Sequence, residues 1–205
     1  MAGGANRAAR LSAMVAEERT IGAREDRGSA MNASDAMHAD HPTEMPPTPP
    51  SSPCNEEENK AIVEQWLTSF WGKDYDPAVV GELAAPSIFF SYSLHMPRVR
   101  PLSLKAFMTD LREAFPDLSL GRTADLVANG DVVMFRWMCE GTHTGPAFYD
   151  LIMGALPYAS GGKMRFSGMS AIRLKAGKIT EEIGLADGVT ALKQLRFIRV
   201  PVWPA

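Results

Sequence analysis

The sequence has little cysteine, no long apolar run and no excess of basic charge. Its two cysteines, Cys54 and Cys139, argue against a disulfide framework and favour a reducing compartment such as the cytoplasm. No apolar stretch reaches the ~18 residues that a transmembrane helix needs, so no contact with a membrane is predicted. The formal net charge of -3 argues against nucleic acid as a partner, because its binders need a basic footprint.

Metal-binding motifs are also missing. Neither CxxC nor HExxH occurs, and the histidines His38, His41, His95 and His143 form no clustered ligand pattern. His38 and His41 have the spacing of a metal-binding pair, but two solvated histidines in a polar tail are the simpler interpretation. We therefore expect no metal and no cofactor.

Composition divides the chain into three parts. Residues 1–56 have few aromatic residues and contain a proline-rich stretch at 46–53, so they are predicted to be disordered. The prolines favour an extended linker, and a docking site for a proline-reading domain is the alternative. A single domain is predicted over 57–197, followed by a tail over 198–205.

Hydrophobic periodicity predicts three helices before the first long run of strands. The first begins at Asn55, which has capping-box spacing, and ends at Gly72. A second, short helix is predicted over 77–84. A third is expected to be capped by Ser103 and stopped by Pro116.

The second half of the chain alternates with a period of two residues, as strands do. A turn with Asn129-Gly130, a strong hairpin signal, joins two of these strands. Strands are predicted over 87–94, 118–127, 131–143, 163–174 and 178–187, with a loop at 144–162 and a last helix over 188–196. This order of elements indicates the α+β class.

Strand alternation places an ionisable group at the end of two apolar faces. His143 ends the face that carries Trp137 and Cys139, and Asp187 ends the face that carries Ile183. Apolar surroundings are expected to raise the pKa of Asp187 and to suit it to proton transfer. Two simpler roles stay open: Asp187 as the N-cap of the last helix, and His143 as a structural histidine.

Several short segments occur in an order typical of one protein family. They are Ala114-Phe115-Pro116-Asp117-Leu118, Leu126-Val127-Ala128-Asn129-Gly130-Asp131, Arg136-Trp137, Gly141-Thr142-His143-Thr144-Gly145, Gly177-Lys178-Ile179-Thr180-Glu181-Glu182, and Asp187 followed by Leu192-Lys193-Gln194-Leu195. Together they resemble the SnoaL-like polyketide cyclases over about 57–197.

The resemblance implies the NTF2-like fold, a conical half-barrel of curved antiparallel sheet wrapped by N-terminal helices, with a short C-terminal helix. It further implies a deep apolar pocket for a small molecule and a homodimer formed through the outer face of the sheet. By the resemblance, Asp187 is the catalytic acid/base and His143 lies near it in the pocket.

Five further residues are expected to bind substrate: Tyr92, His95, Trp137, Phe148 and Phe166. A plain core position is the alternative for Trp137. The loop after Gly145 is about five residues longer than the family pattern, and its apolar residues are expected to form a lid. Gly184 to Ala186 replace the usual aromatic and acidic residues before Asp187. Both departures affect the expected substrate more than the expected fold.

These features predict a cofactor-independent acid/base enzyme that cyclises or isomerises a polyketide-like apolar molecule. Asp187 would move the proton and His143 would donate a hydrogen bond to the developing oxyanion. A non-catalytic binding or scaffolding protein of the same fold is the alternative. A hydratase or epoxide hydrolase would need a second carboxylate that the sequence does not place.

Overall fold

The computed structural model describes residues 56–199. Three predictions therefore concern residues outside this range. They are the disorder of 1–56, apart from Glu56, the possible metal pair of His38 and His41, and the place of Cys54. Within 56–199, no helix is long and apolar enough to cross a membrane.

Within the described part of the chain, five helical segments form close to their predicted places. They are α2 (Glu56–Trp66), a π-helical turn η1 (Leu67–Trp71), α3 (Ala78–Leu83), α4 (Pro101–Ala114) and α5 (Gly188–Gln194). The prediction that Ser103 caps α4 is wrong. The helix begins with Pro101 at its first turn, where proline loses no hydrogen bond, and the Ser103 hydroxyl donates to the carbonyl of Arg100.

A six-stranded sheet forms the other layer. Its strands are β1 (Ala84–Tyr92), β2 (Ser119–Arg122), β3 (Val127–Asn129), β4 (Val132–Thr142), β7 (Lys163–Lys175) and β8 (Lys178–Ala186). The order is β1-β8-β7-β4-β2, with β3 also paired to β4. All neighbours are antiparallel except β1 and β8, which run parallel and so depart from the expected wholly antiparallel sheet.

Two strand boundaries differ from the prediction. The strand expected over 118–127 is split into β2 and β3, each pairing with a different part of β4. The loop expected over 144–162 contains a hairpin of its own, β5 (Phe148–Leu151) and β6 (Gly154–Leu156). The boundary between β7 and β8 agrees with the prediction, because Ala176 and Gly177 between them both have positive φ, as a type I′ hairpin turn requires.

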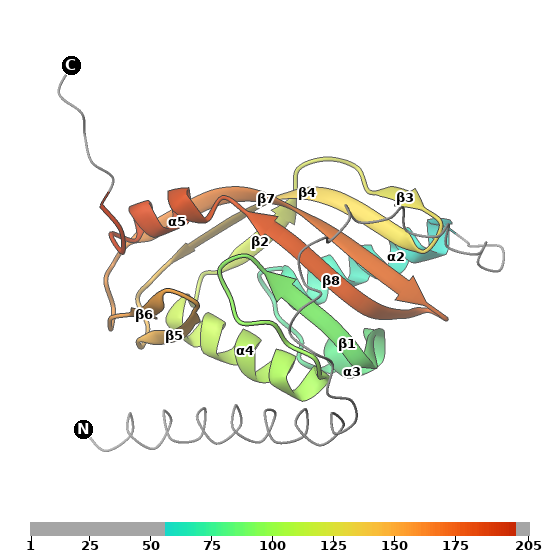
Figure 1. The fold of residues 1–205 in the computed structure, drawn as a ribbon, viewed down its shortest axis with the longest axis horizontal. Helices are drawn as coiled ribbons and strands as arrows, with labels where there is room; N and C mark the ends of the chain where they lie inside the picture. The colour runs from blue at the N-terminus through green and yellow to red at the C-terminus, as the bar shows by residue number, and fades with distance from the viewer. Residues whose placement is uncertain (1–55, 200–205) are drawn as a thin grey trace, which may run out of the picture. The chain divides into compact units, whose positions relative to one another are not determined.

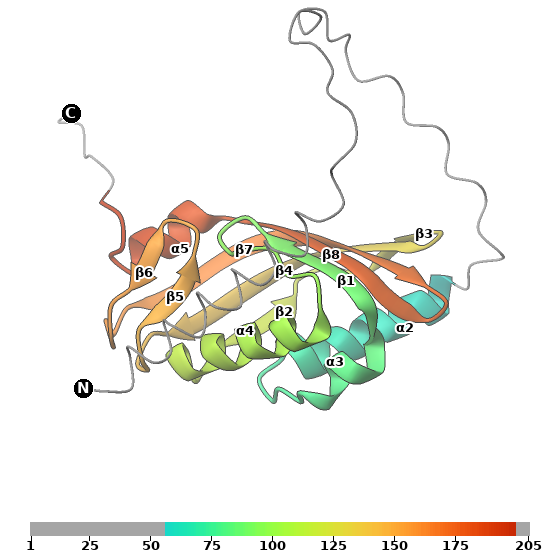
Figure 2. The ribbon, with the colours of Figure 1, turned by 60° about the horizontal axis from the view of Figure 1, so that its bottom comes forward.

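Helices α2, α3 and α4 lie along one face of the curved sheet (Figure 1). The β5–β6 hairpin stands near the C-terminal end of α4, on the side of the domain where α5 follows β8 (Figure 2). Large apolar side chains from both layers meet between them, including the fully buried Trp66, Phe70, Ile88, Leu104 and Val133. This arrangement is the NTF2-like fold, a curved and unclosed sheet with helices at both ends of the domain.

Candidate functional site

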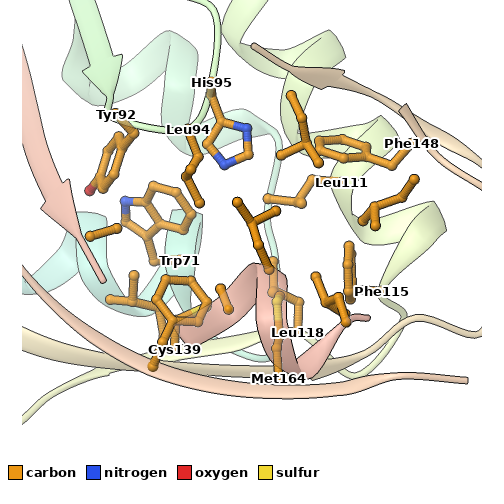
Figure 3. Close-up of a pocket in the computed structure, with 18 of the residues that line it drawn as sticks. Trp71, Tyr92, Leu94, His95, Leu111, Phe115, Leu118, Cys139, Phe148 and Met164 are labelled. Atoms are coloured by element: carbon orange, nitrogen blue, oxygen red, sulfur yellow. The ribbon is translucent and has the colours of Figure 1, made fainter. Parts of the chain in front are cut away.

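A pocket opens between the inner face of the sheet, α4, α5 and the β5–β6 hairpin. The cavity has a volume of about 60 Å³. On the same measure, a single water molecule needs only about 10–15 Å³. Its wall is almost entirely apolar and aromatic, with Trp71, Leu111, Phe115, Leu118 and Met164 among the lining residues (Figure 3). Such a wall suits an uncharged, largely apolar small molecule.

His95 is the polar side chain that faces this space most directly. It follows β1, where its backbone N–H donates to the carbonyl of Tyr92 at 3.0 Å. The rings of Phe107 and Phe148 meet the imidazole edge-on, with centroids 5.1 and 5.9 Å away. Figure 3 shows one ring nitrogen directed into the pocket.

The other imidazole nitrogen faces a buried carboxylate. His95 Nδ1 lies 3.3 Å from Oδ2 of Asp150, while the second carboxylate oxygen is bound by Arg98. Neither Nδ1 nor Oδ2 has a hydrogen bond of good geometry, although both atoms are buried. The 3.3 Å separation is therefore a close approach of the two atoms without the geometry of a hydrogen bond.

A second buried carboxylate, Glu182, lies behind the pocket wall. It accepts hydrogen bonds from the indoles of Trp66 (2.8 Å) and Trp71 (2.9 Å) and from the hydroxyl of Tyr92 (2.6 Å). The Tyr92 oxygen in turn contacts Ser170, which accepts from the indole of Trp137. All the polar atoms of this network have partners, so Tyr92, Trp71 and Trp137 present mainly their ring carbons to the pocket.

Burial shifts the pKa values of the acidic groups in this network. It raises the pKa of Glu182, although the three donors oppose that shift. Burial and the neighbouring Glu182 carboxylate hold the pKa of Tyr92 well above its ordinary value, so the phenol stays neutral. Cys139 also lines the pocket, and burial raises the pKa of its thiol to about 12, which leaves it unreactive near neutrality.

All five residues expected to bind substrate line this pocket: Tyr92, His95, Trp137, Phe148 and Phe166. Their contact with a substrate stays a prediction. Alternation along β4 holds as predicted, with Trp137 and Cys139 on the buried face.

Asp187 does not line the pocket. Its side chain is exposed and caps α5 by accepting a hydrogen bond from the backbone N–H of Thr190. The expectation that apolar surroundings raise its pKa is wrong, because the hydrogen bonds from Thr190 lower that pKa. Its capping role, which the sequence left open, is the one the structure shows.

His143 also lies outside the pocket lining, in a fully buried position. Its Nδ1 lies 3.0 Å from the Ser160 hydroxyl and its Nε2 3.0 Å from the carbonyl of Pro146. Its backbone pairs with Gly162, whereas that of Asp187 pairs with Ser167. Gly162 and Ser167 are five residues apart, and five residues of extended chain span roughly 16 Å. The structure therefore does not bring the backbones of His143 and Asp187 together.

An irregularity in β8 explains why alternation misplaced Asp187. The pairing of β7 with β8 shifts between Arg173 and Leu174. Ile179 and Glu182 are both fully buried despite their odd and even positions, so the inward face changes parity between them. Asp187 therefore shares the outward face with Ile183 and Leu185, and Glu182 turns inward.

The sequence did contain a signal for Asp150. Phe148 and Asp150 stand two residues apart in a short segment, and both are buried. Alternation applied to the long loop would have placed them on one face. Glu182 had no comparable signal, because only the shift in β8 turns it inward.

Known proteins share both the sequence pattern and the architecture of this domain. The family model described as SnoaL-like polyketide cyclase matches residues 61–195. The chain belongs to the SnoaL-like polyketide cyclase family. No curated protein matches the sequence significantly. The family and the fold of this SnoaL-like domain are therefore established. Its reaction has to be inferred from the residues of the site.

Solved structures are similar over most of the chain. One, from Jannaschia sp. CCS1 and named as a SnoaL-like polyketide cyclase, has a TM-score of 0.60 and 21% identity, covering 73% of this chain and 98% of its own. AclR from Streptomyces galilaeus, named as a hydroxylase, has a TM-score of 0.57 and 22% identity, covering 71% and 86%. An epoxide hydrolase of the LEH-like type from M. tuberculosis has a TM-score of 0.52 and 13% identity, covering 69% and 92%. At these identities the likeness concerns the fold.

Within residues 56–199 of this SnoaL-like chain, no group of three or more His, Cys, Asp or Glu side chains is placed to hold a metal ion.

Proposed function

We propose that this SnoaL-like protein is a cofactor-independent acid/base enzyme that either cyclises an apolar ketone by an intramolecular aldol reaction or isomerises it. The observation that supports it most is His95, an imidazole with one nitrogen directed into an otherwise apolar pocket. Imidazole is the side chain whose ordinary chemistry best suits proton exchange near neutrality. We therefore assign His95, expected from the sequence only to bind substrate, as the group that carries the proton.

The reaction needs only one proton carrier. His95 would take a proton from the carbon next to a carbonyl group, leaving an enolate that the substrate's own carbonyl delocalises. In a cyclisation, that carbon would form a bond to a second carbonyl carbon, and the imidazolium would return the proton to the new alkoxide oxygen. In an isomerisation, it would return the proton to a different carbon of the conjugated system.

The apolar wall would assist in two ways. It excludes water, so the charges on the imidazolium and the enolate attract each other more strongly than in solution. It also holds a flexible chain in a folded conformation in which the reacting carbons are close. The neutral thiol of Cys139 and the occupied hydroxyl of Tyr92 leave the proton transfer to His95.

Deuterium exchange tests this proposal without knowledge of the natural substrate. A panel of cyclic and aryl ketones is incubated with the protein in D₂O, and incorporation at the carbon next to the carbonyl is followed by mass spectrometry. We expect the native protein to accelerate exchange for ketones that it binds. His95→Gln should lose about 10²–10⁴-fold of that acceleration, the usual contribution of a general base.

Asp187→Asn is the matched comparison, because asparagine also caps helices well and α5 should be retained. We expect it to keep most of the exchange activity. The family resemblance implies the opposite, that Asp187 is the acid/base, and this stays a prediction. Loss of exchange in Asp187→Asn with full activity in His95→Gln would reject our assignment.

A non-catalytic binding protein is the second candidate. It is favoured by the position of Asp187 and His143, neither of which lines the pocket. In that case ketones would bind with no exchange above the background in any variant.

A homodimer through the outer face of the sheet also stays a proposal. Two rows of paired residues cross this face: Leu185 beside Met169, and Ile183 beside Ala171 and then Met134. All except Ala171 are more than two-fifths exposed. Such a patch is typical of interaction surfaces. A cytoplasmic location remains a prediction.

A further inference from the structure

The carboxylate beside His95 comes from the segment in which this chain is longer than its family pattern. Asp150 lies in β5, and its side chain is 10% exposed. An acidic side chain is seldom so buried unless it is paired. Asp150 is therefore kept in this buried position by its two neighbours, Arg98 and His95.

Backbone contacts fix the hairpin against the segment that carries His95. His95 and Leu151 form an antiparallel bridge, and the N–H of Ile152 donates to the carbonyl of Leu94 at 3.1 Å. Phe148 inserts into the core with 2% of its surface exposed. Asp150 is thus held by contacts on both sides of its position in the strand.

The two oxygens of Asp150 are used differently. Arg98 donates to Oδ1, and the Arg98 guanidinium also lies over the ring of Phe107, 5.3 Å from its centroid. Oδ2 is buried with no hydrogen-bond donor and faces Nδ1 of His95 at 3.3 Å. A buried carboxylate oxygen without a donor destabilises the fold, so a hydrogen on Nδ1 would satisfy both atoms.

That hydrogen has a consequence for the opposite nitrogen. A neutral imidazole carries one hydrogen, so a hydrogen on Nδ1 leaves Nε2 with a free lone pair. Because Nδ1 faces Asp150, Nε2 is the nitrogen directed into the pocket in Figure 3. The two aromatic rings that pack against the imidazole, those of Phe107 from α4 and Phe148 from β5, are uncharged.

We propose that Asp150 is a positioning residue, which fixes the Nδ1–H form of His95 so that Nε2 accepts the substrate proton. The inference rests on the proposed function of His95 and adds that the lengthened hairpin completes the site. Arg98 holds the carboxylate in place through the oxygen that His95 does not use. The protein therefore carries a histidine–aspartate pair that the predicted pair, Asp187 and His143, did not include.

The tautomer of His95 tests this inference in the free protein. Nitrogen-15 NMR in alkaline buffer, where imidazoles are neutral, reports which ring nitrogen carries the hydrogen. We expect Nδ1–H for His95 in the native protein, and a mixture of both forms in Asp150→Asn. The His95→Gln variant assigns the signal.

His143 provides an internal control in the same spectrum. Its Nε2 faces the carbonyl of Pro146, which only accepts, so this ring should carry the Nε2–H form in every variant. Tyr149→Phe is the matched control substitution, because Tyr149 neighbours Asp150 in β5 but is 62% exposed. It should leave both histidines unchanged.

Exchange kinetics give the second measurement. Asp150→Asn should lower kcat for ketone exchange at least tenfold with KM changed less than threefold, and Asp150→Glu should restore part of kcat. An unchanged His95 tautomer in a folded Asp150→Asn protein would overturn the inference, whatever the activity. No ketone exchange by the native protein would instead overturn the proposed function, because the tautomer measurement needs no substrate.

Discussion

Glu182 shows how strongly one side chain depends on its surroundings. Three donors from α2, η1 and β1 converge on a carboxylate that has no exposed surface. Those donors stabilise the ionised form, whereas desolvation favours the protonated form. Desolvation is the larger effect, so the pKa of Glu182 lies above the ordinary value of 4.5.

This direction predicts how stability depends on pH. The folded state holds the Glu182 proton more tightly than the unfolded state, so this group stabilises the fold most below its ordinary pKa. That contribution is lost as the pH rises through the raised pKa of the folded state. The free energy of unfolding of the native protein, minus that of Glu182→Gln, should therefore fall as the pH rises from 4.5 toward neutrality.

Urea unfolding of both proteins at several pH values measures this difference, and groups common to both cancel. A difference that grows with pH would mean that the three donors outweigh desolvation.

Among elements, the π-helical turn η1 makes the Glu182 network possible. Trp66 and Trp71 are five residues apart, which in an α-helix places their side chains about 140° apart around the axis. In the wider π-helical turn the two side chains point in nearly the same direction, and both indoles donate to the carboxylate of Glu182. Periodicity predicted a helix that ends at Gly72, but a wider turn inside it leaves no mark on the apolar pattern.

In strand β8, the missing side chain of Gly184 leaves room that the ring of Tyr92 fills. A methyl group there would lie 2.0 Å from the ring of Tyr92. The ring has no freedom to retreat, because the Tyr92 hydroxyl is bound to Glu182 and Ser170. The absence of a side chain at Gly184 therefore lets Tyr92 take its place in the pocket wall.

Gly184→Ala should accordingly destabilise the protein by about 1–3 kcal/mol, as overpacked cores do. Gly121→Ala is the matched control in β2, since a methyl group there meets nothing within 4 Å. Urea unfolding should show no loss of stability for the control. Equal stability of the two variants would mean that Tyr92 is free to move.

For the whole molecule, the outer sheet face is the surface proposed to pair with a second copy. Leu185→Lys should weaken dimerisation at least tenfold, because a charged ammonium group would enter an apolar interface. Leu102→Lys in α4 is the control, since Leu102 is 75% exposed and Leu185 is 70% exposed. Sedimentation equilibrium measures both. A monomeric native protein would rule out the proposed dimer.

The sequence by itself determined the α+β order of elements, most strand positions and the buried face of β4. These follow from local rules: apolar periodicity, turn residues and alternation within one regular strand. The five residues expected around the pocket, His95 and Phe148 among them, also lie there.

Only the tertiary structure decided which ionisable groups are inside. A shift in the pairing of β8 turned Glu182 inward and left Asp187 outside, and such a shift arises between strands rather than within one. The pairing of His95 with Asp150 joins residues 55 positions apart through a hairpin contact. Contacts between distant segments set burial, and burial sets the proton chemistry of a side chain.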